Sequence, residues 1–314
     1  MRDNRRVERS DSALAAEFDD QRHRLIGLAY RLTGDRQDAE DAVQDAWLRL
    51  ARLDAEDRAS IRELGAWLST AVGRICLDRM RSASARRESY VGPWLPEPVV
   101  REVDGQPQDP LDAVVAQEDL RMAALHVLHE LSPEQRLAVV LHDGFDVPFG
   151  EIAEVLGGTA ASARQHAVRG RGAITGAELP QPAPMSEQQR ALDDLIAALA
   201  SRDVDAVARA LHPRTVVYGD GGGKARTARR PVVGVDKVSR FAVGLAERYR
   251  EGLLSGMRLV LVNGELGLLG PGPPEGSSSV DAPAARVLGF AVRDGRAAEL
   301  YDVANPDKLA RVRF

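Results

Sequence analysis

Apolar residues recur every three or four positions in the first part of the chain, a spacing typical of helices that bury one face. Three such stripes follow one another: Leu25, Leu28, Ala29 and Leu32; then Ala39, Val43, Ala46, Trp47 and Leu50; then Trp67, Leu68, Ala71, Ile75 and Leu77. We expect a bundle of helices over residues 12–89, with Trp67 in its core. Cys76 lies within the third stripe, and we expect it to be a buried thiol.

Proline-rich segments interrupt the helical pattern twice. The first is Tyr90-Val-Gly-Pro-Trp-Leu-Pro-Glu-Pro-Val with Asp104-Gly-Gln-Pro-Gln-Asp-Pro, and the second is Glu178-Leu-Pro-Gln-Pro-Ala-Pro. Proline at this density cannot continue a helix, so we expect an extended linker over residues 90–110. Residues 111–177 again show helical patterns, and Ser132-Pro-Glu-Gln is a capping box that predicts the start of a helix.

The last part of the chain, residues 186–314, changes from helical to strand-like patterns. Two short helical stripes come first, and apolar runs then predict strands at Thr215–Tyr218, Met257–Asn263, Arg286–Val292 and Ala297–Val303. Arg293-Asp-Gly-Arg predicts a tight hairpin turn. Helices followed by antiparallel strands indicate an α+β roll. We therefore predict a multidomain chain with two all-α modules followed by an α+β roll.

One segment of the second helical module indicates contact with DNA. In residues 151–171, Ala153 and Gly157 have the spacing of a helix-turn-helix, where a small residue lets the second helix approach and glycine forms the turn. Thr159 can cap the second helix. That helix carries donors suited to phosphates and base edges: Ser162, Arg164, Gln165, His166 and Arg169. Two packed surface helices with an ordinary charged face are the alternative for this segment taken alone.

The composition is not that of a protein that binds DNA unaided. Its 42 Lys and Arg and 47 Asp and Glu give a net charge of −5 at pH 7, whereas phosphate neutralisation supplies most of the affinity of free-standing DNA-binding proteins. We therefore expect DNA binding to require a partner.

The sequence indicates neither a metal site nor a membrane segment. A single cysteine excludes an internal disulfide and a cysteine-based zinc site, and we expect no cofactor or metal. Met1–Ser12 lacks the apolar core of a signal peptide, and no apolar run is long enough to cross a bilayer. We expect a cytoplasmic protein that does not bind membranes.

Several motifs carry a more specific signal. Thr33-Gly-Asp-Arg-Gln-Asp-Ala-Glu-Asp-Ala-Val-Gln-Asp-Ala-Trp-Leu-Arg resembles the second conserved region of bacterial sigma factors of the extracytoplasmic-function class. Leu131-Ser-Pro-Glu-Gln-Arg and the helix-turn-helix resemble the fourth region. The motifs Trp94-Leu-Pro-Glu-Pro, Asp220-Gly-Gly-Gly-Lys and Asn305-Pro-Asp-Lys-Leu are similar to those of one subgroup. In that subgroup a SnoaL-like domain, of the nuclear-transport-factor-2 and ketosteroid-isomerase fold, follows the fourth region.

The resemblance implies that the chain binds promoter DNA and the core of RNA polymerase, at the β′ clamp and the β flap. In this class the helix from Asp38 to Leu50 docks on the β′ clamp helices, which assigns polymerase contact to Asp38, Asp41, Gln44 and Asp45. A solvated acidic face is the alternative. The helix-turn-helix would read the −35 element.

The first module would read the −10 element, where flipped bases are captured and cations follow the DNA strand. Arg74, Arg79 and Arg81 are the candidate cations. Aromatic residues for base stacking are few, and only Trp67 and Tyr90 lie near.

The resemblance also implies a conical apolar pocket in residues 186–314, where enzymes of this fold place an acid or a base. The candidates are His212, Tyr218, Asp220, Asp236, Tyr301 and Asp302. No pair has the spacing of a recognisable acid–base dyad, and His212 is expected at a helix end before Pro213. We expect no catalysis, although a ligand-binding sensor or a polyketide-cyclase-like enzyme remains the alternative for this domain.

We expect this domain to regulate the others by packing on the DNA-reading modules, like a fused anti-sigma factor. Its candidate regulatory residues, together with those of the linker, are Trp94, Pro96, Asp220, Gly221, Lys224, Asn305, Pro306, Asp307 and Lys308. The glycines after Asp220 allow close approach to another surface, and the segment lacks the length and the Ser or Thr of a phosphate-binding loop. A one-component repressor is the alternative for the whole chain, and the acidic composition argues against it.

Overall fold

The computed structural model describes residues 11–87, 90–107, 109–117, 119–249, 254, 256–273 and 283–314. The chain divides into two compact units. The first contains the described residues up to Ala85, Asp109–Val114 and Leu128–Ala177; the second contains Arg86–Gln108, Val115–Val127 and Glu178–Phe314.

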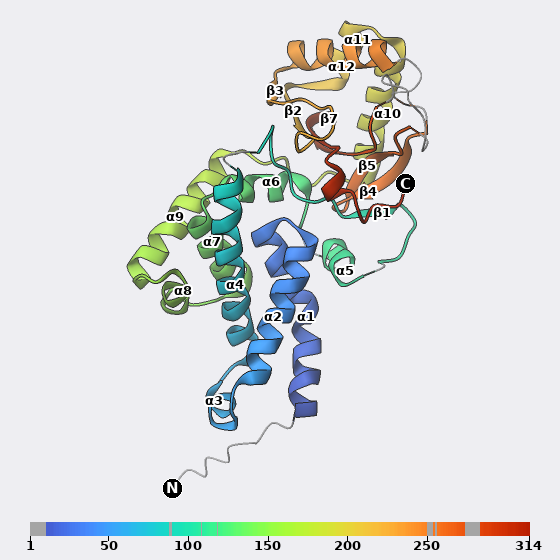
Figure 1. Cartoon of the computed structure of the whole chain (residues 1–314). Coiled ribbons are helices and arrows are strands. Elements are labelled where there is room, and N and C mark those ends of the chain that lie inside the picture. The colour runs from blue at the N-terminus through green and yellow to red at the C-terminus, as the bar shows by residue number, and fades with distance from the viewer. Residues whose placement is uncertain are drawn as a thin grey trace. The chain divides into compact units, whose positions relative to one another are not determined.

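All the secondary-structure elements in the described residues of the first unit are helices. Its helices are α1 (Asp11–Thr33), α2 (Arg36–Arg52), α3 (Ala55–Ser60), α4 (Leu64–Arg87), α7 (Pro133–Phe145), α8 (Phe149–Leu156) and α9 (Ala160–Gly176) (Figure 1). Two further helices, α5 (Pro110–Gln117) and α6 (Met122–Glu130), each contribute residues to both units. The predicted caps are confirmed, because Ser132 and Thr159 each accept a hydrogen bond from the backbone N–H three residues later.

The predicted apolar stripes form the core of the first unit. Leu28 and Leu68 are fully buried, and so is Cys76, as expected. Burial raises the pKa of the Cys76 thiol to about 12. The expectation for Trp67 was wrong, because this side chain is only partly buried and lines a groove. The reason is helical geometry: the core face of the first turns of α4 carries Leu64 and Leu68, and Trp67 lies to one side of it.

A buried arginine joins α7 to α1. Arg136 is 3% exposed. Its Nη1 donates to the carbonyl of Leu32 at 2.6 Å, and its Nη2 donates to the carbonyl of His129 at 3.0 Å. Leu32 lies in the last turn of α1, where carbonyl groups have no partner within the helix. The guanidinium therefore satisfies a helix end and fixes α7 beside it.

The second unit is built on a seven-stranded mixed sheet in the order β1-β4-β5-β6-β7-β2-β3, as far as the chain is described. The strands are β1 (Val100–Glu102), β2 (Leu211–Asp220), β3 (Val232–Val233), β4 (Arg258–Val262), β5 (Glu265–Gly270), β6 (Arg286–Arg293) and β7 (Arg296–Val303). Neighbours are antiparallel except β2 and β7, which run parallel and pair Asp220 with Val303. The segments that follow these two strands therefore leave the sheet at the same end.

The four predicted strands are present, and three more were not predicted. In the β6–β7 turn, Asp294 and Gly295 have φ of 51° and 69°, as expected for a type I′ hairpin. Asn263-Gly264 forms a similar turn with φ of 51° and 83°, and it leads into β5, whose glycines weaken the strand pattern. The other two, β1 and β3, have only three and two residues.

The extended linker contains a short strand that was not predicted, because Val100–Glu102 pairs antiparallel with β4. One expectation about position needs correction. His212 does not lie at a helix end. The preceding helix α11 (Val204–Ala210) stops before it, and His212 is buried in β2.

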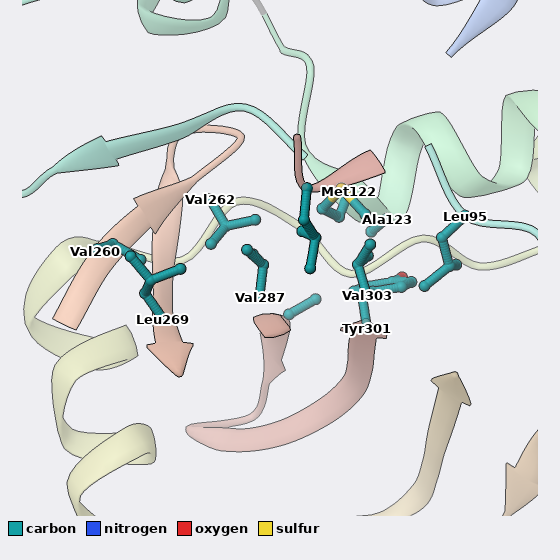
Figure 2. Packing of buried hydrophobic residues seen from close by; sticks show 11 residues of the cluster. Leu95, Met122, Ala123, Val260, Val262, Leu269, Val287, Tyr301 and Val303 are labelled. Atoms are coloured by element: carbon teal, nitrogen blue, oxygen red, sulfur yellow. The ribbon is translucent and has the colours of Figure 1, made fainter. Parts of the chain in front are cut away.

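Each face of the sheet has a different cover. Helix α10 (Met185–Ser201), α11 and α12 (Val235–Tyr249) cover one face, where Leu192 packs with Phe290 and Leu195 with Val217. On the opposite face, which we call the back face, Leu95 of the linker and residues of α6 bury apolar strand residues (Figure 2). The α6 residues are Met122 and Ala123. Parts of the linker and of α6 therefore belong to the core of the second unit.

Polar side chains interrupt the apolar back face. The ring of His126 in α6 lies 4.3 Å from that of Tyr218 and 5.9 Å from that of Tyr301, centroid to centroid. Glu265, at the start of β5, is buried 3.8 Å from Arg121. Burial raises the pKa of Glu265 to about 7, although Arg121 acts in the opposite direction.

This carboxyl group makes stability depend on pH. The raised folded-state pKa means that the protonated form of Glu265 favours folding. That stability is fully present below the ordinary carboxyl pKa of 4.5 and is lost as pH rises through about 7. We expect Glu265→Gln, which stays neutral, to stabilise the protein at about pH 8 by up to about 3 kcal/mol and to have little effect at about pH 5. Urea unfolding at both pH values measures this difference.

Glu102→Gln is the control, since Glu102 is in an exposed ion pair with Arg258. An equal gain in stability for both variants at high pH would contradict a special role for the burial of Glu265.

Candidate functional site

Small residues set the geometry of the helix-turn-helix. Gly157 adopts the left-handed conformation with φ of 70° after α8, and the N–H of Gly158 donates to the carbonyl of Ala153 at 2.9 Å. Ala163 and Ala167 are fully buried, as expected. A Cβ at Gly170 would lie 2.6 Å from a methyl group of Val139, so glycine is required where α9 crosses α7.

The expected −35 residues lie on α9 but differ in exposure. Arg164, Gln165 and Arg169 are exposed, whereas His166 is partly buried. Ser162 is engaged in the capping box, where its hydroxyl accepts from the N–H of Thr159 at 3.0 Å. Of the five expected residues, these exposed three are therefore the ones whose side chains are most accessible to another molecule.

Aromatic packing positions Arg164 on this surface. Its guanidinium carbon lies 5.3 Å from the centroid of the Phe149 ring, and that ring stacks on His142 at 3.9 Å. Val168, which was not among the predicted DNA contacts, is 57% exposed one turn after Arg164. Its position four residues after Arg164 was the available signal, because such residues share a helix face. Arg171 is paired with Asp143.

The acidic face of α2 contains the four expected polymerase contacts. Gln44 and Asp45 are exposed, and Asp38 and Asp41 are partly buried. Two of the four are joined to a residue expected to bind DNA. Arg79 donates to the Asp38 carboxylate at 3.1 Å and to the Asp45 carboxylate at 3.1 Å.

The other −10 candidates are also engaged within the first unit. Arg81 pairs with Glu134 at 3.1 Å. Arg74 lines a groove of about 710 Å³ with Trp67, and its guanidinium donates to the backbone carbonyl of Glu154 at 3.2 Å. The structure therefore places Arg74, Arg79 and Arg81 on the surface of α4, each with an intramolecular acceptor.

In the second unit, a buried carboxylate joins the linker to the sheet. Asp220 is fully buried at the end of β2. One carboxylate oxygen accepts from the N–H of Leu95 at 2.9 Å and from Lys308 Nζ at 2.7 Å. The other accepts from the hydroxyl of Tyr90 at 2.5 Å and from the N–H of Gly222 at 3.1 Å. Four donors satisfy a charge that would otherwise be costly to bury.

Lys308 completes this arrangement from the segment after β7. Its ammonium group donates to the carbonyl of Leu95 and lies 4.0 Å from the centroid of the Trp94 ring, a cation–π distance. We call the set of Asp220, Lys308, Tyr90, Trp94 and Leu95 the linker clamp.

The remaining candidate regulatory residues support the linker clamp. Asn305 donates from its side chain to the hydroxyl of Tyr90 at 2.9 Å, and its backbone N–H donates to the carbonyl of Asp220 at 2.9 Å. Pro306 begins the 3-10 helix that carries Lys308. Gly222 has φ of 57°, and a Cβ there would lie 2.5 Å from the Asn305 side chain. The glycine run is therefore needed for close approach.

The last candidate regulatory residues lie around the linker clamp. Pro96 is buried beside Leu95, and a Cβ at Gly221 would collide with the carbonyl of Ala225. Lys224 and Asp307 form an exposed ion pair. Tyr90, expected only as an aromatic residue for base stacking, belongs to the linker clamp instead. Burial and the hydrogen bond to Asp220 both raise the pKa of Tyr90.

The residues expected in the pocket are dispersed: Asp302 lines a cavity on the helix-covered face of the sheet, and the other five lie elsewhere. Tyr218 and Tyr301 stack at 5.7 Å on the back face, and Asp220 is in the linker clamp. Asp236 is exposed on α12, and His212 lies 3.6 Å from Asp294. The reason is strand alternation, which sends neighbouring residues to opposite faces.

In the part of the chain that the structure describes, no group of three His, Cys, Asp or Glu side chains has the arrangement of a metal site. Within the same residues, no helix is both long enough and apolar enough to span a bilayer.

Comparisons with known proteins match both helical modules. The family model of Sigma-70 region 2 matches residues 18–86, and that of Sigma-70, region 4 matches residues 121–174. The ECF RNA polymerase sigma factor SigJ of Mycobacterium tuberculosis is 50% identical over 299 residues, which cover 94% of this chain and 92% of SigJ. The probable ECF sigma factor SigI of the same organism is 33% identical over 60% of this chain and 63% of its own.

Structural comparison extends the similarity to the C-terminal domain. The crystal structure of M. tuberculosis SigJ aligns with a TM-score of 0.76 and 48% identity, covering 94% of this chain and 98% of that one. Two helical sigma regions are thus followed by an α+β domain. Sigma factors bind core RNA polymerase and promoter DNA, and they are not enzymes. The chain belongs to the extracytoplasmic-function (ECF) RNA polymerase sigma factors.

Proposed function

We propose that this sigma factor directs promoter-specific initiation and that its C-terminal α+β domain restrains it in place of a separate anti-sigma factor. The linker clamp carries this proposal. Through Asp220 and Lys308, the C-terminal domain holds the segment that joins sigma region 2 to sigma region 4.

The start of region 4 is held in the same unit. The region 4 match begins at residue 121, and Arg121 donates to the carbonyl of Pro180 at 2.9 Å. Asn263, in the β4–β5 turn, donates to the carbonyl of Leu120 at 2.9 Å and accepts from the N–H of Val99 at 3.0 Å. With Met122 buried on the sheet, α6 begins inside the core of the C-terminal domain. If regions 2 and 4 are to separate to the spacing of two promoter elements, these contacts would have to break.

Promoter contacts are proposed for the two sigma regions. Arg164, Gln165 and Arg169 would read bases and phosphates of the −35 element, with Ser162 and His166 in support, and Val168 offers an apolar contact suited to a thymine methyl group. Arg74, Arg79 and Arg81 would follow the −10 strand after exchanging their intramolecular acceptors for phosphates.

Polymerase contacts are proposed for the acidic face of α2, where Asp38, Asp41, Gln44 and Asp45 would meet the β′ clamp helices, and for region 4, which would meet the β flap. Because Arg79 bridges two of these acidic residues, binding DNA and binding polymerase would both draw on the same ion pairs. Core polymerase would supply most of the affinity for DNA, which accounts for a net charge of −5.

Replacing Arg164 tests the −35 proposal. We expect Arg164→Ala to weaken transcription from a −35-dependent promoter by roughly 5- to 150-fold, the loss of a bidentate base contact of about 1–3 kcal/mol. Reconstituted transcription with core polymerase measures the effect on a promoter first selected from a library. Binding to core polymerase should be unchanged.

Arg171→Ala is the matched control, because Arg171 lies on the same helix but is paired with Asp143. Transcription that is insensitive to Arg164→Ala, or that falls equally in both variants, would contradict the proposed reading surface.

Releasing the linker clamp tests the regulatory proposal. Lys308→Met removes one partner of a buried ion pair, a change that costs about 3–5 kcal/mol at such sites. We expect faster hydrogen exchange at the N–H of Leu95, which donates to Asp220. Transcription with core polymerase should rise severalfold, because less free energy is needed to free the linker. Asp220→Asn should act in the same direction.

Arg214→Met provides the control, since it removes only an exposed ion pair with Glu178, worth about 0–1 kcal/mol. If Lys308→Met accelerated exchange at Leu95 and left transcription unchanged, the C-terminal domain would not regulate through the linker.

A further inference from the structure

The helix-covered face of the sheet contains a cavity of about 120 Å³ that the proposed function does not use. Helices α10 and α12 and strands of the sheet line it. Among the described residues of the lining, all are apolar except Arg286 and Asp302. A mostly apolar cavity with a few convergent polar groups is the usual form of a small-molecule site.

The two polar residues form a buried ion pair. Arg286 Nη1 lies 3.1 Å and 3.3 Å from the two carboxylate oxygens of Asp302, and the side chains are 6% and 13% exposed. Burial raises the pKa of Asp302, while Arg286 acts in the opposite direction. An apolar pair of similar volume is often as stable as a buried ion pair. Stability alone therefore gives no reason for this pair in an otherwise apolar cavity.

The pair defines the chemistry of a ligand. Arg286 offers N–H donors and Asp302 offers oxygen acceptors, and a hydroxyl group can both accept from the first and donate to the second. The two charges balance, so a charged ligand would bring an uncompensated charge into the cavity. The volume is close to that of a cavity of roughly 150 Å³ that binds benzene. A six-membered ring that bears a hydroxyl group fits these limits.

The ion pair is also connected to the linker clamp. Asp302 accepts from the hydroxyl of Thr227 at 2.8 Å. Thr227 lies against Gly219, because a Cβ at Gly219 would collide with its hydroxyl. Gly219 immediately precedes Asp220 of the linker clamp. Thr227 and Gly219 therefore connect Asp302 to Asp220.

The turn after Asp220 makes a second connection. The N–H groups of Lys224 and Ala225 both donate to the carbonyl of Gly221, at 2.9 Å and 3.0 Å. This turn leads directly into Arg226, whose carbonyl lies 3.5 Å from Arg286 Nη2. The segment between residues 221 and 227 is thus held at one end by the linker clamp and at the other by the ion pair.

We propose that this cavity binds a small uncharged molecule, an apolar ring with one hydroxyl group directed at Arg286 and Asp302, and that its binding strengthens the hold of the linker clamp. The existence of the binding site does not depend on the proposed function, whereas its consequence for the linker rests on that function. A filled cavity orders the ion pair and Thr227, and with them the turn that supports Asp220.

Phenol, benzene and benzoate are the probes, used with the full chain in the absence of polymerase. We expect saturable binding of phenol by calorimetry, roughly tenfold tighter than that of benzene because of the hydrogen bonds to the ion pair. Benzoate should not bind measurably. At saturating phenol, hydrogen exchange of the N–H of Leu95 should slow, since that group reports directly on the linker clamp.

Two variants and one control localise the effect. Ala242→Phe adds a ring to the cavity lining and should abolish phenol binding. The double variant Arg286→Met with Asp302→Leu replaces both charges at once, which keeps the fold better than breaking the pair. It should retain benzene binding and lose both the preference for phenol and the effect on Leu95. Val233→Phe adds a ring at a position that is 56% exposed and should bind phenol as the unmodified protein does.

Equal affinity for phenol and benzene would overturn the proposal, as would phenol binding that survives Ala242→Phe. Binding that leaves exchange at Leu95 unchanged would also overturn it. These measurements contain no promoter and no polymerase, so their failure is distinct from a failure of the linker clamp to control transcription.

Discussion

The buried carboxylate of Asp220 is the constraint on which the second unit depends. A fully buried charge is tolerated only when donors satisfy it and an opposite charge balances it. Here the donors come from the linker, from the loop after β2 and from the segment after β7. If one of these segments left, the Asp220 carboxylate would lose a donor and would remain buried with its charge partly unsatisfied. The linker of a sigma factor is thereby made part of the core of another domain.

Sheet topology brings these partners together. Asp220 and Lys308 are 88 residues apart. They nevertheless meet, because β2 and β7 run parallel and their C-terminal ends lie side by side. The back face of that sheet buries Leu95 and the first turn of α6 (Figure 2). The linker clamp, at the C-terminal ends of β2 and β7, therefore holds the linker by polar contacts. The back face holds the linker and the start of region 4 by apolar contacts.

Local features of the fold could be predicted from the sequence, and contacts between distant segments could not. Helical stripes, the caps at Ser132 and Thr159 and the turn at Asp294-Gly295 depend on a few adjacent residues. Strand β5 was missed because its glycines weaken the pattern. Trp67 was wrongly placed in the core, because the burial of a residue beside the apolar stripe depends on what packs there. The motifs that supply Trp94, Asp220 and Lys308 of the linker clamp were found only by resemblance. The structure was needed to show that Tyr90 belongs to the linker clamp and that Arg79 pairs with the acidic face of α2.

The position of Lys308 in the chain has a consequence in time. Synthesis proceeds from the N-terminus, and domains fold as they emerge. The helix-turn-helix ends at Gly176, whereas Lys308 and the partner strand of β2 come more than a hundred residues later. At ~5–20 residues per second this interval is on the order of ten seconds. Each new molecule therefore has its helix-turn-helix before its linker can be held, because the linker clamp forms only after Lys308 has been synthesised.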